Sequence, residues 1–280
     1  MKHFLIYTNH HKDPKREATN RIKEYLENKG QKCTIITNND GTFPEEEDIP
    51  EDADCMIVLG GDGTMLRAAR DIKKGHIPLI GVNMGSLGYM TEVEPENVEE
   101  AMDKLIDGDY EMESRMMLHG SVIKEKGEIY EEWALNDVVI SRSGSLKLIK
   151  LDIYVNGQLL NAYNADGVIV TTPTGSTGYS LSAGGPIVNP IARLIMLTPI
   201  CPHTLNSRSI ILSSEDIIEI RIPEGREGGS QNLEVNFDGS HVVAVQTGDR
   251  IRIQRSVKTT EIIKISKAGF LDVLHKKISE

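Results

Sequence analysis

Short runs of consecutive, mostly apolar residues alternate with helical periodicity over the first third of the chain. The runs at 4–7, 55–59 and 78–82 are too short for buried helices and show no polar alternation. Strands with such continuous apolar runs are buried on both faces, which is typical of a parallel sheet covered by helices on both sides. These runs therefore restrict the first third to an α/β architecture.

Amphipathic helices are predicted between these runs. Ala18, Ile22 and Leu26 recur at spacings of four residues, which places them on one face of a helix. Similar patterns occur at 65–72 and at 98–106. Strands and helices that alternate in this way predict a Rossmann-like fold with a parallel sheet.

The pattern changes after about residue 114, where apolar and polar residues alternate with period two. The stretch 151–155 shows this alternation, and it is followed by Asn156-Gly157, a dipeptide that favours a type I′ hairpin turn. Glycine and asparagine turns separate further stretches of this kind, and helical patterns become scarce. We therefore expect an all-β, sandwich-like fold here.

We expect two domains, as a length of 280 residues suggests. The first is the α/β domain, residues 1–113, and the second is the β-rich domain, residues 114–255. A helical pattern reappears at 268–278, so the segment 256–280 is expected to return to the first domain.

Charge and hydropathy exclude several classes of protein. The formal net charge of -11 argues against a nucleic-acid binder, which needs a basic face. The negative net charge does not exclude the binding of small phosphorylated ligands, because backbone N–H groups, helix N-termini and a bound cation can hold phosphate. No apolar run approaches the roughly 18 to 20 residues of a membrane span, and no signal peptide is read. We expect a cytoplasmic protein that does not enter a membrane.

The three cysteines, Cys33, Cys55 and Cys201, are far apart and form no C-x-x-C pair. An odd, scattered set fits a reducing compartment and predicts neither a disulfide framework nor a zinc site. We expect three buried or half-buried thiols.

The turn at 60–64, GGDGT, lies where a predicted buried strand meets a predicted helix. Its glycines allow a tight turn and let phosphate oxygens approach backbone N–H groups at the positive end of the helix dipole. Arg67, one turn into the helix, offers a charge-assisted contact to the same phosphates.

Asp62 is the unexpected member of this turn, because a carboxylate repels phosphate. Two interpretations are balanced at this point. Asp62 either caps the helix, or it acts on a phosphate-bound cation or on the proton of an attacking hydroxyl, as a kinase base does.

A second motif occupies 166–186, where a predicted strand leads into a run rich in threonine, serine and glycine around Tyr179. Composition alone favours a plain exposed loop by about two to one. The same residues also suit a polar ligand with a flat ring, held by hydroxyl and backbone groups. His203 and His241 are interpreted as turn residues. No Ser-His-Asp set, H-E-x-x-H or Walker-type lysine turn is present in the sequence.

These motifs resemble those of a known family, the NAD kinases. The matching stretches follow one another in the family's order and are GGDGT at 60–64, GVNMGSLGYMTEV at 81–93, LNDVVI at 135–140, ADGVIVTTPTGSTGYSLSAGGP at 165–186 and TPICPHTLNSR at 198–208. Diacylglycerol and sphingosine kinases and 6-phosphofructokinases share a turn similar to the first stretch. The long run ending in SAGGP and the TPICPH stretch are far more specific.

The resemblance implies a role for individual residues. Asp62 would accept the proton of the 2′-hydroxyl of the adenosine ribose, with Gly63 at the phosphates. Asn136 and Asp137 would hold the adenosine part of NAD, and Asp166 would bind at the nicotinamide end, where its carboxylate can accept from the carboxamide.

Further residues come from the same resemblance. Those implied to contact NAD, with Tyr179 at the adenine, are Lys147, Asn164, Thr174, Thr177, Gly178, Tyr179, Ser180, Leu181 and Ser182. Cys201 lies at a position where family members contribute a residue across a subunit interface. Three positions depart from the family's pattern: Asp137 stands where glutamate is as frequent, Gly178 where alanine is commoner, and Ser86 where a longer polar residue is usual.

The implied activity is transfer of the γ-phosphoryl group of ATP, or of polyphosphate, to NAD, with a divalent cation such as Mg²⁺, by a homodimer or homotetramer. Two alternatives stay open. A lipid kinase of the diacylglycerol type shares the GGDGT turn, although no basic amphipathic helix is seen. A dinucleotide sensor without turnover would gain nothing from a carboxylate beside phosphates.

Overall fold

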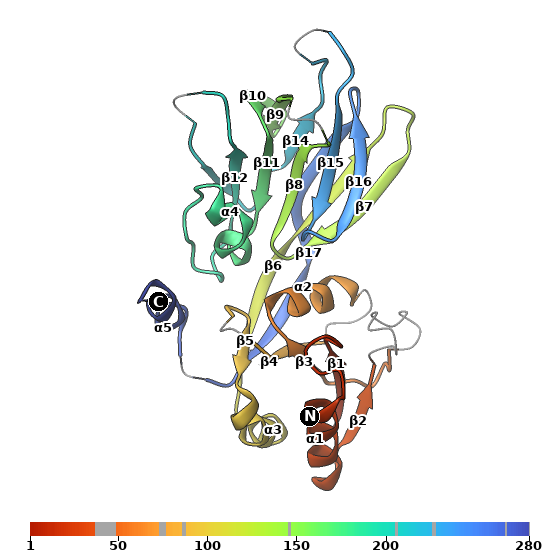
Figure 1. The fold of residues 1–280 in the computed structure, drawn as a ribbon, viewed down its shortest axis with the longest axis vertical. Helices are drawn as coiled ribbons and strands as arrows, with labels where there is room; N and C mark the ends of the chain where they lie inside the picture. Colours follow the sequence, from red (N-terminus) through yellow and green to blue (C-terminus); the bar gives the residue numbers. More distant parts are fainter. Residues whose placement is uncertain are drawn as a thin grey trace. The chain divides into compact units, whose positions relative to one another are not determined.

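The chain folds into two compact units (Figure 1), Met1–Ser114 with Thr260–Glu280, and Arg115–Thr259. The computed structural model describes residues 1–36, 49–72, 77–85, 88–144, 147–204, 207–225, 228–266 and 268–279. The fold class expected from the sequence is confirmed, with an α/β part, a β-rich part and a C-terminal helix assigned to the first unit.

The first unit contains the predicted alternation of strands and helices. Its elements are β1 (His3–Thr8), α1 (Glu17–Asn28), β2 (Lys32–Ile35), β3 (Cys55–Gly60), α2 (Asp62–Asp71), β4 (Leu79–Asn83), β5 (Thr91–Val93), the 3₁₀ turn η2 (Pro95–Asn97), α3 (Val98–Asp107) and α5 (Phe270–Ser279). Every residue of β1, β3 and β4 is buried, as continuous apolar runs require.

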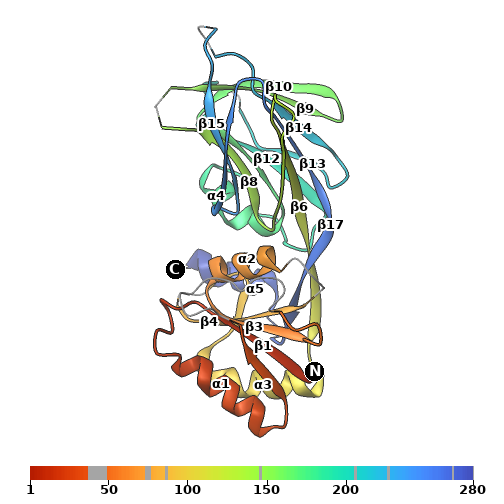
Figure 2. The same cartoon turned by 90° about the vertical axis from the view of Figure 1, so that its right-hand side faces the viewer.

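The sheet of the first unit is parallel, in the order β2-β1-β3-β4, with β5 beside β4. Figure 2 shows α1 and α3 on one face of this sheet and α2 on the other. Ile22 and Leu26 of α1 join Met102 and Leu105 of α3 in one hydrophobic cluster with β1 and β3. The strands β1 and β3 are neighbours in the middle of this order. From β1 the chain moves outward to β2, and from β3 it moves outward in the opposite direction to β4. The carboxyl ends of β1 and β3 therefore form a topological switch point, where open α/β sheets bind ligands.

The second unit is built almost wholly from strands. Its elements are β7 (Ile129–Ala134), β8 (Asp137–Arg142), β9 (Ile149–Val155), β10 (Gln158–Ala165), β11 (Gly167–Thr171), η3 (Thr174–Thr177), α4 (Tyr179–Ser182), β12 (Leu194–Ile200), β13 (Ile210–Ser213), β14 (Ile218–Arg221), β15 (Asn232–Phe237) and β16 (His241–Gln246). One antiparallel sheet has the order β13-β12-β11-β8-β15-β16. The strands β10, β9 and β14 form the other layer together with β17 (Arg250–Lys264).

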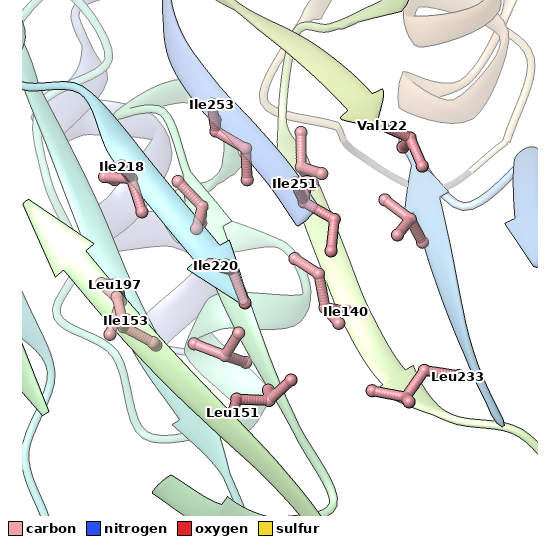
Figure 3. Packing of buried hydrophobic residues seen from close by; sticks show 14 of the residues in the cluster. Val122, Ile140, Leu151, Ile153, Leu197, Ile218, Ile220, Leu233, Ile251 and Ile253 are labelled. Atoms are coloured by element: carbon pink, nitrogen blue, oxygen red, sulfur yellow. The ribbon is translucent and has the colours of Figure 1, made fainter. Parts of the chain in front are cut away.

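A single hydrophobic cluster lies between these two layers, and it includes Ile140 and Leu197 from one layer and Ile153, Ile220 and Ile251 from the other. Figure 3 shows these side chains directed into a common core. The alternation along β9 explains this burial, because every second side chain of a strand points to the same face. The sandwich-like fold predicted from the alternation with period two is therefore present.

Two long strands belong to both units. The strand β6 (Glu111–Ile123) contains the boundary after Ser114, and β17 contains the boundary after Thr259. In the first unit, Ile262 of β17 pairs in parallel with Leu79 of β4. The first unit is therefore assembled from two separate stretches of chain.

Candidate active site

The turn after β3 closes tightly at the switch point of the first unit. The N–H group of Asn9, just after β1, donates to the carbonyl of Leu59 at 2.9 Å, and Asn9 Nδ2 donates to Thr64 Oγ1 at 3.2 Å. A Cβ added to Gly60 would lie 2.2 Å from Thr64 Oγ1, so only glycine fits there. Asn9 was not predicted from the sequence, where its one signal is its position directly after the first strand.

Asp62 lies in the first turn of α2, and the capping interpretation is wrong. The N-cap is Gly61, and no side chain caps this helix. The carboxylate instead accepts backbone N–H groups from another loop, Tyr89 to Oδ2 at 2.8 Å and Met90 to Oδ1 at 3.0 Å. A Cβ on Gly88 would lie 2.1 Å from Asp62 Oδ1. The carboxylate is thus oriented by two donors and packs directly onto a glycine.

Gly63 and Arg67 are exposed on the same helix. A Cβ on Gly63 would meet nothing within 4 Å, so its surroundings leave the backbone open to a ligand. The Arg67 guanidinium hydrogen-bonds the hydroxyl of buried Tyr7. Burial raises the pKa of Tyr7, and the contact with Arg67 opposes that rise. Arg67 is therefore tied to β1, on the same side of the sheet as the turn.

In the second unit, the threonine-rich run is held against residues 135–136. The Thr172 N–H and the Thr171 hydroxyl donate to the Asn136 carbonyl at 2.8 and 2.7 Å, and the Thr172 hydroxyl donates to the Leu135 carbonyl at 2.6 Å. Residues 171–176 are all buried. The interpretation as a plain exposed loop is therefore wrong for this part of the run.

Two buried polar atoms beside this contact have no hydrogen-bond partner within the described ranges. They are Asn136 Oδ1 and Thr174 Oγ1. Gly175 and Gly178 surround the same asparagine, since a Cβ on Gly175 would lie 2.5 Å from the Asn136 carbonyl oxygen and one on Gly178 would lie 3.4 Å from Asn136 Nδ2. Buried polar atoms normally have partners, so these two indicate a place where a polar ligand completes the site.

Asp137, the first residue of β8, is a buried carboxyl group with only 6% of its surface exposed. Burial, reinforced by the neighbouring Asp238 carboxylate, raises the pKa of Asp137 to about 7. Near neutral pH this group is therefore present both as an acid, which can donate a hydrogen bond, and as a carboxylate.

Two further predicted residues precede β11, Asn164 within β10 and Asp166 directly after it. Arg142 Nε donates to Asp166 Oδ1 at 3.0 Å, which fixes the orientation of that carboxylate. The carbonyl of Asn164 accepts the N–H of His203 at 2.8 Å, in agreement with the interpretation of His203 as a turn residue. Lys147 is exposed. Arg142 was not predicted from the sequence, because nothing in its spacing distinguishes it from other arginines.

The short helix α4 presents Tyr179, Leu181 and Ser182 to solvent, with Tyr179 47% exposed. Ser180 is buried and its hydroxyl lies 3.2 Å from that of Thr198, while Thr177 is partly buried. An aromatic ring exposed beside buried polar groups is available to a flat ligand.

Cys201 follows β12 and is exposed, with φ +43°. The expectation of three buried or half-buried thiols is therefore wrong for Cys201, although it is confirmed for Cys33 and Cys55. Ser86 lies outside the described residues.

The comparisons with known proteins agree over the whole chain. Residues 5–110 match the ATP-NAD kinase N-terminal domain, and residues 135–265 match the ATP-NAD kinase C-terminal domain. An NAD kinase of Lachnospira eligens is 45% identical over 293 aligned residues that cover 99% of this chain and 100% of the relative. One of Agathobacter rectalis is 46% identical, covering 99% of each chain. The chain belongs to the NAD kinase family.

Two solved structures of NAD(H) kinases are similar to this fold. Yeast NADH kinase complexed with NADH superimposes with a TM-score of 0.88 and 25% identity, covering 100% of this chain and 88% of that one. An NAD kinase from Archaeoglobus fulgidus in complex with ATP superimposes with a TM-score of 0.81 and 28% identity, covering 100% of both. As a member of the NAD kinase family, this chain is a phosphotransferase, and the lipid-kinase alternative is not favoured.

In the ranges that the structure describes, no three His, Cys, Asp or Glu side chains gather into a metal-binding group. In the same ranges no helix is both long enough and apolar enough to cross a membrane.

Proposed function

We propose that this NAD kinase transfers the γ-phosphoryl group of ATP to the 2′-hydroxyl of the adenosine ribose of NAD, giving NADP and ADP. The observation that carries the proposal is the Asp62 carboxylate at the start of α2, which accepts the backbone N–H groups of Tyr89 and Met90. The two similar structures, one complexed with NADH and one with ATP, support both substrates.

Asp62 supplies the base in this reaction. Each of its oxygens accepts one N–H and retains a lone pair, so the carboxylate can still take a proton. The ribose O–H bond breaks with its proton passing to Asp62. The oxygen forms a new bond to the γ-phosphorus, and the bond to the bridging oxygen of ADP breaks. Such phosphoryl transfer depends on positioning and electrostatics rather than on covalent chemistry with the protein.

The start of α2 supplies the phosphate site. Its helix dipole, the open backbone at Gly63 and the Arg67 guanidinium all favour a negative ligand. Mg²⁺ in kinase sites is typically held by one or two carboxylates with substrate phosphates and water, and Asp62 fits that donor set. When bound, the cation would offset the charge of the phosphates.

The second unit would orient NAD. Asn136 Oδ1 and Thr174 Oγ1, which are buried and have no hydrogen-bond partner among the described residues, would bind the adenosine part together with Asp137. Asp166, oriented by Arg142, would accept from the nicotinamide carboxamide. The further NAD contacts assigned to this unit are Lys147, Asn164, Thr177, Gly178, Tyr179, Ser180, Leu181 and Ser182.

We further propose a cytoplasmic homodimer or homotetramer in which Cys201 lies near the subunit interface. The exposed thiol and the exposed apolar side chains of Ile191 and Ile211, at 58% and 57%, support the proposal, because all three lie in the second unit and could contact a partner subunit. The molar mass in solution from light scattering checks this assembly, and a monomer would contradict it.

Replacement of Asp62 tests the proposed function. NADP formed from NAD and Mg-ATP is read with an NADP-specific dehydrogenase, with polyphosphate as a second donor. We expect Asp62→Asn to lower kcat by about 10²- to 10⁴-fold, the usual contribution of a general base. NAD binding measured by calorimetry should persist.

The matched control is Asp107→Asn, an exposed carboxyl group at the end of α3, which should leave kcat unchanged. Wild-type protein that binds NAD without forming NADP would be a dinucleotide sensor. Full activity of Asp62→Asn would contradict the assigned base.

A further inference from the structure

The turn between β15 and β16 contacts the segment 135–137, about a hundred residues earlier in the chain. Three successive backbone N–H groups donate to the Asp238 carboxylate: Leu135 to Oδ2 at 2.8 Å, Asn136 to Oδ1 at 2.8 Å and Asp137 to Oδ1 at 3.1 Å. In return the Asp238 N–H donates to the Asp137 carbonyl at 3.1 Å. One carboxylate therefore fixes the backbone donors of the whole segment.

The turn itself is shaped to present this carboxylate. Asp238 has φ +48° and Gly239 has φ +68°, which is the left-handed pair of a type I′ hairpin turn. Among residues with a Cβ, aspartate and asparagine adopt this conformation most readily. A short side chain in this position extends from the hairpin to the segment 135–137.

The opposite edge of the same segment is also occupied. The carbonyls of Leu135 and Asn136 accept hydrogen bonds from the hydroxyls of Thr172 and Thr171. The backbone donors and acceptors of Asn136 are therefore used within the protein, while its side-chain Oδ1 is buried without a partner in the described part of the chain. The backbone is held so that this amide remains for a ligand.

From this geometry we propose that Asp238 is a positioning residue of the NAD site. Its carboxylate orders residues 135–137, and thereby places the Asn136 and Asp137 side chains for the adenosine part of NAD. The inference rests on the proposed function, which assigns NAD to those two side chains. An ordered segment binds more tightly because its ordering entropy is lost before the ligand arrives.

Substitutions at Asp238 distinguish a role in positioning the NAD site from a role in the stability of the fold alone. Asp238→Ala removes all three accepted hydrogen bonds, and we expect KM for NAD to rise at least 10-fold while KM for ATP changes less than twofold. Asp238→Asn keeps the left-handed backbone and an amide oxygen at the Oδ1 position for two of the three N–H groups. It should therefore rescue part of the loss, with KM for NAD between the wild-type and alanine values.

Asp249→Asn is the matched control. Asp249 is a buried carboxylate of the same unit that accepts the N–H groups of Glu125 and Gln246, both at 2.9 Å, on a different turn. We expect this variant to lower Tm with both KM values unchanged. If Asp238→Ala does not fold, the KM values of Asp238→Asn are compared with those of Asp249→Asn instead.

Two outcomes would overturn the inference: a wild-type KM for NAD in both Asp238 variants, or equal rises in KM for NAD and ATP that the Asp249 control reproduces. Failure of the proposed function is distinguishable, because wild-type protein would then form no NADP. In that case the dissociation constant of NAD from calorimetry replaces KM. A weaker NAD complex in Asp238→Asn still supports positioning, and an unchanged one contradicts it.

Discussion

At the scale of single residues, the same device is used in both units. Asp62 accepts two N–H groups from residues 89 and 90, and Asp238 accepts three from residues 135–137. A carboxylate that binds successive N–H groups fixes a loop without covering the side chains of that loop. At Asp62 the acceptor itself is the proposed base, whereas at Asp238 the acceptor acts through the residues it orders.

Gly88→Ala tests how closely the proposed base must be held. The new Cβ would lie 2.1 Å from Asp62 Oδ1, so the carboxylate has to move from its two donors. Since small displacements of a catalytic group are costly, we expect kcat to fall by about 10²-fold with the protein still folded. The control is Gly229→Ala, where a Cβ meets nothing within 4 Å. Equal kcat values in the two variants would argue against this packing requirement.

The buried carboxyl group of Asp137 makes stability depend on pH. Its pKa is about 7 in the folded chain against about 3.9 in an unfolded one. The folded state therefore binds more protons between these values, and the resulting stabilisation is lost as the pH rises from about 4 through 7.

Asp137→Asn removes this titration. We expect the free energy of unfolding of Asp137→Asn, relative to wild type, to be higher at pH 8 than at pH 5 by a few kcal/mol, measured by urea denaturation. The difference between the two proteins, rather than either absolute value, cancels the titration of groups that do not interact with Asp137. A pH-independent difference would show that the pKa of Asp137 is close to normal.

At the scale of elements, the periodicities predicted the helices α1, α2, α3 and α5 and the strands β1, β3, β4 and β9. The hairpin predicted at Asn156-Gly157 forms between β9 and β10, with φ +50° and +80°. Gly108, with φ +79°, ends α3 as a left-handed C-cap. The helix expected from residue 65 begins three residues earlier, at Asp62, because glycine carries little signal of its own for a helix start.

Asn156→Ala tests the hairpin as an element. The side chain accepts the Ile217 N–H at 2.9 Å and donates to Asp216 Oδ1 at 2.7 Å, and its left-handed backbone disfavours alanine. We expect the free energy of unfolding to fall by about 1–3 kcal/mol with KM for NAD unchanged. The exposed Gln158→Ala on β10 is the control for urea denaturation. Equal stability of both variants would be contrary to the expected role of the turn.

At the scale of the whole molecule, the two units differ in how the chain builds them. Arg115–Thr259 is one continuous stretch with its own hydrophobic cluster. The other unit needs the end of β17, where Ile262 and Ile263 are fully buried and Ile262 pairs with Leu79. Removal of such side chains leaves a cavity and exposes a strand edge.

Two fragments test this difference. We expect residues 115–259 to unfold in one cooperative urea transition and to form no NADP, since Asp62 is absent. Residues 1–114 alone should be markedly less stable, because they lack the buried isoleucines of β17. This expectation would be contradicted if the 115–259 fragment unfolded without cooperativity while the 1–114 fragment was stable.

Local patterns in the sequence determined the fold class and the positions of the motifs. A period of two or of four residues, a continuous apolar run and an Asn-Gly pair each act within a few residues, so they can be read without a structure. The turn at 60–64 and the threonine-rich run were found for this reason, and the resemblance that they carry assigned their chemistry. That Asp62 accepts N–H groups from residues 89 and 90, rather than capping α2, could not be read locally.

Only the tertiary structure decided which residues hold these motifs. The partners of Asp62 lie 27 and 28 residues away, and Asp238 lies 103 residues from Leu135. Such contacts depend on strand order and register, which local periodicity does not encode. For the same reason the structure alone showed the burial of residues 171–176, the exposure of Cys201 and the hydrogen bonds of Asn9, Arg142 and Asp238.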